Sequence, residues 1–302
     1  MKRFEFGKLA LAATLALSIF SPAPARAEFQ MLDDGTGTKQ VVHDGSAVYA
    51  LKDNGNIWMY AQGRWQQLDN GSGTRQIAAA GGRVYAMKDD GRVFRLSFGQ
   101  WSPIGYKGSR QIAAAGTDLY TLENNDDIFM FWHGDGQWRK VDNGTRTTMI
   151  SGDDQRGLFV LKNSGQIFHH LGNGQFELTD DGAGTNQIDS AGGVLYALKA
   201  NGNIWRNNGQ WQQVDDGQNT LQVAADGMNC SILKGDRSVF VRRNEQWARA
   251  NTPPDVKALA ARADEVVALR QNGNILIARN GNIMSDIRVQ RFQQLYDADH
   301  KE

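Results

Sequence analysis

The chain has 302 residues, 33 of them basic and 33 acidic, so its formal net charge is zero. This balance gives no electrostatic reason to expect a nucleic acid or an anionic membrane as partner. A single cysteine, Cys230, excludes an intrachain disulfide, so the stability of the fold must come from packing.

The first 27 residues have the pattern of a secretory signal peptide. Basic residues precede an apolar run from Leu9 to Phe20, and Ala25 and Ala27 mark a small-residue cleavage site. We expect cleavage after Ala27 and a mature chain that is periplasmic or secreted, without a membrane span. Loss of four basic residues and one acidic residue leaves 29 basic and 32 acidic residues, a net charge of −3.

From Phe29 onward the chain repeats one pattern at intervals of 35 to 38 residues. The aromatic residues that open the copies are Phe29, Trp65, Trp101, Trp138, Phe176, Trp211 and Trp247, with Ile283 in the next slot. Internal repetition at this period indicates a solenoid, a propeller or an array.

Each copy contains four short runs with strand-like composition, separated by turn residues. Residues 48–58 read VYALKDNGNIW and residues 195–205 read LYALKANGNIW, and the Asn-Gly pair in each is a strong hairpin signal. Four antiparallel strands per copy, repeated seven times, predict an all-β fold, a seven-bladed β-propeller over residues 28–283. A solenoid is the alternative, but it needs capping repeats, and the terminal copies resemble the others.

The ends of the repeat region predict how the ring closes. Residues 29–33 read as a fourth strand with no blade before them, and the last copy supplies only three strands. We therefore expect the N-terminal strand to complete the last blade, with the segment at Ile283 as a competitor for that place. Residues 284–302 are expected to form a tail or a short helix.

The connections between blades carry a signature of Asp, Asn, Gly and Thr, as in residues 33–38 and 69–74. Such a face could bond sugar hydroxyls once per blade, although turn chemistry alone explains the composition. Calcium is a third interpretation, but alternating Asp ligands are absent. The candidate ligand-binding residues are Asp34, Asn70, Asn143, Asp181, Asp216, Thr38, Thr74, Thr185, Lys39, Arg75 and the out-of-frame Trp132.

Two further repeated positions favour structural roles. A glutamine just inside the first run recurs at Gln40, Gln76, Gln111, Gln187 and Gln222, and we expect each to bond the backbone of a neighbouring blade rather than to ring a channel mouth. The strict period of the tryptophans favours packing between blades over sugar stacking. Trp132 and Phe98 lie outside this frame and are better candidates for exposed contacts.

Catalysis has little support in the sequence. The five histidines show no recurring metal spacing, and the first runs are mostly Ala, Ile and Val, with Asp189 as the main exception. Nucleophile-elbow, phosphate-loop and zinc motifs are absent. Cys230 occupies an apolar strand slot and is expected to be a small buried hydrophobe. We therefore predict a non-enzymatic protein with no catalytic residues, no metal and no cofactor.

The cycle W-x-x-[LV]-D-[DN]-G, Q-[IV]-A-A and V-Y-A-L-K-x-N-G-N-I-[WF] resembles the tectonin repeat and covers residues 29–283. The resemblance implies a lectin-like propeller that binds a glycan or a bacterial surface saccharide such as lipopolysaccharide. The VYALK and GNIW segments also resemble the repeat of quinoprotein-type propellers, which include an outer-membrane assembly scaffold. A periplasmic scaffold for protein partners is therefore the alternative function.

Overall fold

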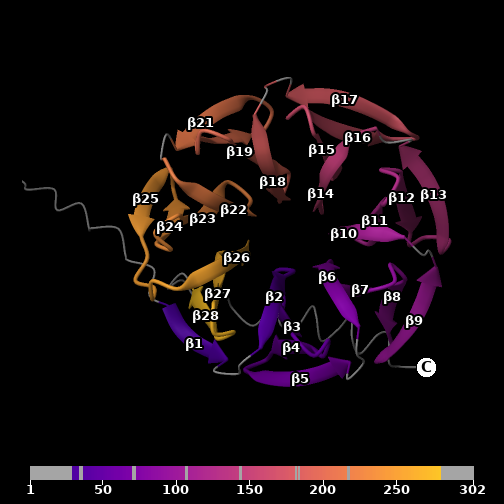
Figure 1. Cartoon of the computed structure of the whole chain (residues 1–302), viewed down its shortest axis with the longest axis horizontal. Coiled ribbons are helices and arrows are strands. Elements are labelled where there is room, and N and C mark those ends of the chain that lie inside the picture. The colour runs from indigo at the N-terminus through magenta and orange to yellow at the C-terminus, as the bar shows by residue number, and fades with distance from the viewer. Residues whose placement is uncertain are drawn as a thin grey trace, which may run out of the picture.

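The protein is described here from a computed structural model, which places residues 29–33, 37–69, 73–105, 108–142, 145–180, 182, 184–215 and 218–279. Seven sheets of four antiparallel strands stand around a common axis as a β-propeller (Figure 1). The fold class is the predicted one. Among the described residues no helix is long and apolar enough to cross a membrane. The predicted signal peptide, the Ile283 segment and the tail at 284–302 lie outside the described residues.

Blades 1 to 3 follow each other in the chain, each running from the axis outward. Their strands are β2 (Thr38–His43), β3 (Val48–Lys52), β4 (Ile57–Ala61), β5 (Arg64–Asp69); β6 (Thr74–Ala80), β7 (Arg83–Lys88), β8 (Val93–Ser97), β9 (Gln100–Gly105); β10 (Ser109–Ala115), β11 (Asp118–Glu123), β12 (Ile128–Trp132), β13 (Gln137–Asp142).

Blades 4 to 7 continue the same order around the ring. Their strands are β14 (Thr147–Asp153), β15 (Gly157–Lys162), β16 (Ile167–Gly172), β17 (Gln175–Asp180); β18 (Thr185–Ala191), β19 (Val194–Lys199), β20 (Ile204–Asn207), β21 (Trp211–Asp215); β22 (Thr220–Asp226), β23 (Asn229–Lys234), β24 (Val239–Arg243), β25 (Gln246–Arg249); β26 (Val256–Arg262), β27 (Glu265–Arg270), β28 (Ile275–Arg279), β1 (Phe29–Asp33).

The N-terminal strand closes the ring, as predicted. β1 pairs antiparallel with β28, with Phe29 opposite Ala278 and Asp33 opposite Ile275, and it forms the outer edge of blade 7 (Figure 1). The first and last described segments of the chain are therefore joined by a ladder of backbone hydrogen bonds, and the ring has no free end to be capped.

Small residues line the axis because neighbouring inner strands crowd together there. Ala78 and Ala113 are buried at this position. Gly152 in blade 4 shows how tight the packing is, because a Cβ added to it would lie 2.2 Å from the carbonyl oxygen of Ala114 in the preceding blade. The hairpin between the second and third strands needs a residue in the left-handed conformation. Gly55 supplies it in blade 1 (φ 88°), whereas in blade 3 the non-glycine residue Asp126 adopts it (φ 71°).

The repeated glutamines clamp adjacent blades together, which confirms the interpretation favoured from the sequence. The Gln40 amide donates to the carbonyl of Ile77 at 3.0 Å and accepts from its N–H at 2.9 Å. The same two-way bond joins Gln76 to Ile112, Gln111 to Ile150, Gln187 to Val223 and Gln222 to Leu259. Buried backbone groups between the blades are satisfied in this way.

The repeated tryptophans also join blades. The indole N–H of Trp65 donates to the carbonyl of Leu32 in the preceding blade at 3.1 Å. Four more tryptophans do the same: Trp101 to Leu68, Trp138 to Ile104, Trp211 to Thr179 and Trp247 to Val214. Packing between blades, favoured from their period, is confirmed for these residues.

Candidate functional site

The propeller has two faces with different connections. We call the face that carries the fourth-to-first and second-to-third connections the loop face; in blade 1 these are residues 34–37 and 53–56. The opposite face, which carries the first-to-second and third-to-fourth connections, is the turn face; in blade 1 these are residues 44–47 and 62–63. Because strands alternate in direction, every blade presents the same kinds of connection on the same face.

At the loop face, five blades contain the same half-buried Asp–Lys–Thr triad. In blade 1 the Lys52 ammonium lies 2.6 Å from Asp33 Oδ2 and 2.8 Å from Thr38 Oγ1. The other triads are Asp69–Lys88–Thr74, Asp142–Lys162–Thr147, Asp180–Lys199–Thr185 and Asp215–Lys234–Thr220. Each lysine therefore ties the end of one blade to the first strand of the next.

Blades 3 and 7, whose loop signatures differ in the sequence, replace the triad. In blade 3 Glu123 stands in the lysine position and accepts from the Ser109 hydroxyl at 2.8 Å. In blade 7 Arg270 pairs with Asp255 at 2.8 Å. These blades keep a polar tie with different residues.

The predicted site residues fall into three groups. Thr38, Thr74 and Thr185 are buried, and their hydroxyls accept hydrogen bonds from the triad lysines. Lys39 and Arg75 are exposed at the start of the inner strands of blades 1 and 2. Asp34, Asn70, Asn143, Asp181 and Asp216 lie outside the described residues.

Trp132 is not on the face of the other candidates. It ends β12 next to a turn of the turn face, its side chain is 43% exposed, and the Arg139 guanidinium lies 4.3 Å from its ring centroid. Phe98, at the corresponding turn of blade 2, is 65% exposed. Both aromatics are exposed, as the sequence suggested.

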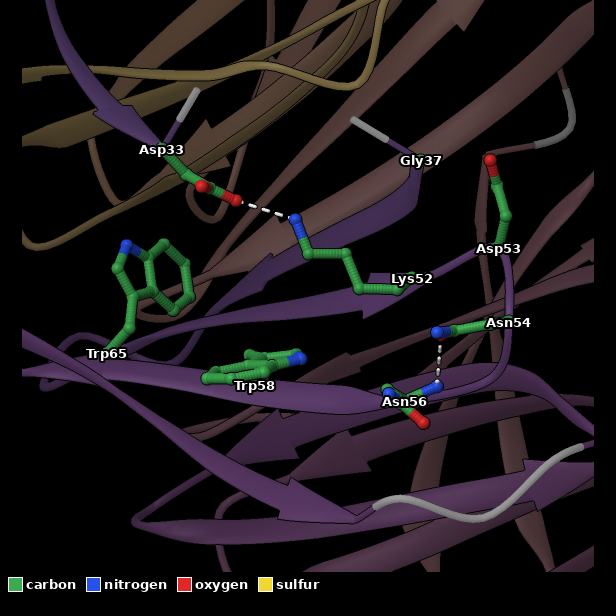
Figure 2. A pocket seen from close by; sticks show the side chains of 8 residues that line it. All are labelled: Asp33, Gly37, Lys52, Asp53, Asn54, Asn56, Trp58 and Trp65. Atoms are coloured by element: carbon green, nitrogen blue, oxygen red, sulfur yellow. Dashed lines mark hydrogen bonds and ion pairs between the residues drawn. The ribbon is translucent and has the colours of Figure 1, made fainter. Parts of the chain in front are cut away.

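The loop face carries a hollow of about 540 Å³ at blade 1. Trp58 and Trp65 are half-buried and lie beside the Lys52–Asp33 ion pair (Figure 2). The hairpin turn forms the rim, where Asn54 Oδ1 accepts from the N–H of Asn56 at 3.0 Å (Figure 2). Two indoles, one ammonium–carboxylate pair and exposed amides thus surround one concave space, together with Gly37 and Asp53.

Blade 5 carries a second hollow of about 470 Å³ built from the same positions of the repeat. Trp205 and Trp211 replace the two indoles, the Lys199–Asp180 pair replaces the ion pair, and Asn201 stands at the turn. Ala200 takes the place of Asp53, so this hollow lacks one carboxylate. The sequence reasoning missed Trp58 and Trp205, although GNIW in these two copies was visible as a signal.

Blades 2 and 3 have phenylalanine where these blades have Trp58 and Trp205, and a cation lies over the ring. The Arg92 guanidinium lies 5.8 Å from the Phe94 centroid and pairs with Asp90. In blade 3 the Lys140 ammonium lies 5.9 Å from the Phe129 centroid. At these positions blade 1 has the neutral Asn56 and Gln67, so its indole carries no side-chain cation of this kind.

The turn face has a different hollow of about 580 Å³ at the axis. First-to-second turns of six blades line it, and the Arg262 guanidinium of blade 7 reaches Asp154 of blade 4 at 3.2 Å. Asp44, Asp226 and Asp264 give its wall an acidic character. Asp226 is buried and pairs with Arg243 at 3.0 Å; burial raises its pKa, and the arginine opposes that rise.

Groups with catalytic potential are occupied by structural contacts. Cys230 is buried between blades 5 and 6, as expected, and burial raises the pKa of its thiol to about 12. The His169 ring bonds the carbonyl of Arg156 at 2.7 Å, and burial lowers the pKa of His170. Within the described residues, no group of three or more His, Cys, Asp and Glu side chains could hold a metal.

Comparison with known proteins identifies the fold. No protein-family model and no curated protein sequence matches the chain. Among solved structures, YCF48 bound to a D1 peptide has a TM-score of 0.62 at 14% identity, covering 84% of this chain and 95% of YCF48. BamB from Moraxella catarrhalis gives a TM-score of 0.52 at 15% identity, covering 81% of this chain and 83% of BamB.

PorZ, a surface component of the type-IX secretion system of Porphyromonas gingivalis, has a TM-score of 0.61 at 12% identity. The match covers 85% of this chain, which spans only 40% of the PorZ chain. At these identities the likenesses establish the propeller fold alone.

Proposed function

We propose that the protein is an exported, non-enzymatic binding propeller that holds carbohydrate in the hollows of blades 1 and 5. The observation that carries the proposal is that each hollow combines two half-buried indoles with an ion pair and an exposed amide, Asn54 in blade 1 and Asn201 in blade 5. The predicted signal peptide at residues 1–27 and the resemblance to tectonin repeats support the same conclusion.

The chemistry of the hollows suits a sugar ring. An indole face offers a flat apolar surface to the C–H groups of a pyranose, while its edge remains polar. Planar amides and carboxylates bond vicinal hydroxyls, and an ammonium donates to ring or hydroxyl oxygens. A concave site with apolar walls and a few convergent polar groups is the usual form of a small-ligand site.

Two similar hollows on one rigid face favour polymeric ligands. Each hollow is open and offers few contacts, so each is expected to bind weakly. A saccharide that reaches both hollows, or a surface that displays many copies, gains affinity because the second contact is intramolecular. We therefore expect repeating surface saccharides, lipopolysaccharide included, to bind more tightly than short oligosaccharides.

The experiment that tests this proposal is a glycan and lipopolysaccharide array probed with the mature chain, residues 28–302, and a heat-denatured control. We expect binding that free sugar competes. Trp58→Ala combined with Trp205→Ala is expected to abolish it. Phe94→Ala combined with Phe240→Ala changes the same strand position in blades without a tryptophan there and serves as the matched control. A clean negative for the wild type across the array contradicts carbohydrate recognition.

A protein-binding scaffold is the second candidate. Three consecutive blades expose an apolar side chain at the third-to-fourth turns of the turn face: Phe98, Trp132 and Leu171. Exposed apolar residues that cluster on one face mark interaction sites. YCF48, a propeller of similar fold, was solved with a bound peptide.

The scaffold hypothesis predicts that periplasmic or extracellular partners co-purify with the wild type and are lost from the Phe98→Ser, Leu171→Ser double variant. Leu221→Ser, which changes an exposed leucine on the loop face, is the control. Recovery of the same partners with the double variant contradicts a role for this part of the turn face.

A further inference from the structure

Every inner strand has a β-bulge at the same place, next to the loop face. The register shifts between Thr38 and Gln40 in blade 1 and between the equivalent residues in the six other blades. A bulge leaves one residue out of the ladder and re-aims its side chain. The seven bulge residues are Lys39, Arg75, Arg110, Thr148, Asn186, Leu221 and Lys257.

The bulge residues of four consecutive blades are basic. Passing from blade 7 through blades 1, 2 and 3, they are Lys257, Lys39, Arg75 and Arg110, and we call this set the basic arc. The bulge residues of blades 4 to 6 are neutral. Half of the axial end of the loop face is therefore positively charged and half is not.

Hydrogen bonds to the next blade hold three of the four side chains of the basic arc, those of Lys39, Lys257 and Arg110, in place. Lys39 donates to the carbonyl of Thr74 at 2.7 Å, and Lys257 donates to the carbonyl of Thr38 at 2.8 Å. Arg110 donates to the carbonyl of Thr147 in the same way. The long side chains are thus partly ordered along the ring before any ligand arrives, which lowers the entropy lost on binding.

Within the residues that the structure describes, three charges of the basic arc have no ionic partner. Arg110 pairs with Asp126, but no carboxylate among the placed side chains lies within 4.0 Å of Lys39, Arg75 or Lys257. A carbonyl oxygen carries no net charge and leaves these cations unneutralised. Like charges at adjacent positions repel each other, so this arrangement favours an anionic partner.

The basic arc is a local exception in the molecule. The mature chain has an expected net charge of −3, and the axial end of the turn face gathers Asp44, Asp154, Asp226 and Asp264 around a single Arg262. General excess of basic residues therefore does not account for the arc. The positive charge of the arc and its position on the loop face, where the hollows lie, favour a ligand shared with the hollows instead.

We propose that the basic arc binds the sulfate, phosphate or carboxylate groups of an anionic saccharide whose sugar ring occupies the hollow of blade 1. This inference rests on the proposed carbohydrate recognition. Lys39 lies two residues after Gly37, which lines that hollow, so one short segment of the loop face connects the arc with the hollow. The hollow of blade 5 adjoins the neutral bulge residues Asn186 and Leu221, so it takes neutral sugar units.

The test uses dextran sulfate as probe and neutral dextran of the same chain length as reference, with binding to the mature chain measured by calorimetry at low and physiological salt. We expect dextran sulfate to bind more tightly than dextran, with an excess that salt reduces. Lys39→Gln combined with Arg75→Gln is expected to weaken dextran sulfate binding about tenfold, at roughly threefold for each exposed charge.

The matched control is Arg64→Gln combined with Arg249→Gln, which removes the same charge from outer strands. Equal loss in this control, or no loss in the arc variant, would overturn the proposal. Poly-glutamate of similar charge is the third probe. If it binds as tightly as dextran sulfate and depends equally on the arc, the ligand is any polyanion, and the assignment to a saccharide is wrong.

Failure of this inference is separable from failure of the proposed function. The arc variant is expected to bind neutral dextran as the wild type does, whereas the Trp58→Ala, Trp205→Ala variant loses binding to dextran. If the wild type binds neutral dextran but does not bind dextran sulfate more tightly, the proposal for the basic arc is wrong, and the proposal for the hollows stands. A wild type that binds neither polymer rejects the arc as a site for dextran sulfate, and the glycan array then decides on carbohydrate recognition itself.

Discussion

Blades 1 and 2 share one framework and differ at one surface. Both contain the Asp–Lys–Thr triad, the glutamine clamp and the inter-blade indole. Above this framework, blade 1 presents the open indole of Trp58, whereas blade 2 presents Phe94 with Arg92 over its ring. The repeated residues hold the ring together, and the residues that vary between copies distinguish the hollows of blades 1 and 5 from the covered ring of blade 2.

Removing a triad lysine should have the largest effect, and it should be equal in the two blades. Lys52→Met and Lys88→Met each remove the lysine that pairs with a largely buried carboxylate, that of Asp33 or Asp69. We expect each to lower the free energy of unfolding by about 2–3 kcal/mol. Arg139→Met, which breaks an ion pair with Asp135 that is exposed on both sides, should cost less than about 1 kcal/mol. Chemical denaturation measures all three, and unequal losses at Lys52 and Lys88 would show that the framework is not shared.

Copying the surface of blade 2 onto blade 1 should close its hollow without harming the fold. The variant is Asn54→Asp, Asn56→Arg and Trp58→Phe, which reproduces Asp90, Arg92 and Phe94. We expect at least about tenfold weaker saccharide binding, corresponding to about 1.4 kcal/mol, with the melting temperature nearly unchanged because the arrangement already exists in the molecule. Unaltered binding to every array ligand would show that the hollow of blade 1 is not a site.

The reverse substitutions, which give blade 2 the surface of blade 1, should have a smaller effect, a gain in saccharide affinity. Asp90→Asn, Arg92→Asn and Phe94→Trp give blade 2 the residues of blade 1, opening a third hollow. We expect a few-fold rise in apparent affinity for a polymeric saccharide through avidity, and no change for a short oligosaccharide measured per site. Lower polymer affinity than the wild type would mean that features beyond these three positions form the hollow.

A buried carboxylate in blade 5 should make the stability of the protein depend on pH. Asp189 stands where blade 2 has Ala78, and its carboxylate accepts from the N–H of Ala225 at 2.8 Å and of Ser190 at 3.0 Å. Burial raises the pKa of Asp189 to about 6 in the folded state, against 3.8 for an unperturbed aspartate.

The folded state therefore binds this proton more tightly than the unfolded chain, so the contribution of Asp189 to stability rises as pH falls from above 6 toward 4. Relative to Asp189→Asn, the wild type should gain on the order of 2 °C in melting temperature between pH 7 and pH 5.5. Parallel melting curves for the two proteins across this range would contradict the assignment.

The sequence predicted the parts of the fold that each copy encodes locally. Strand composition, the Asn-Gly turns and the unmatched fourth strand at Phe29 were enough for seven blades and their closure. The period alone also predicted the roles of the glutamines and of Trp65 and its equivalents. A residue that is repeated in nearly every blade is expected to serve the contact between neighbouring blades, which every blade has.

The site was harder to predict because it depends on long-range neighbours. Thr38 has the appearance of a loop residue until Lys52, at the end of the following strand, is seen to bond it. Trp58 has the pattern of an ordinary third-strand aromatic, and only the structure shows that it stands with Trp65 and the Lys52–Asp33 pair in the wall of a hollow. Trp132 proved exposed but lies on the opposite face, which composition could not reveal.

The seam between β1 and β28 has a consequence for biosynthesis. The strand that emerges first from the ribosome is the last for which a partner exists, because β28 is made at the far end of the chain. Until then six blades can form from contiguous segments while the seventh cannot. A circular permutant that carries residues 28–33 after the last strand should therefore fold faster at similar final stability, since its seventh blade is no longer assembled from distant segments.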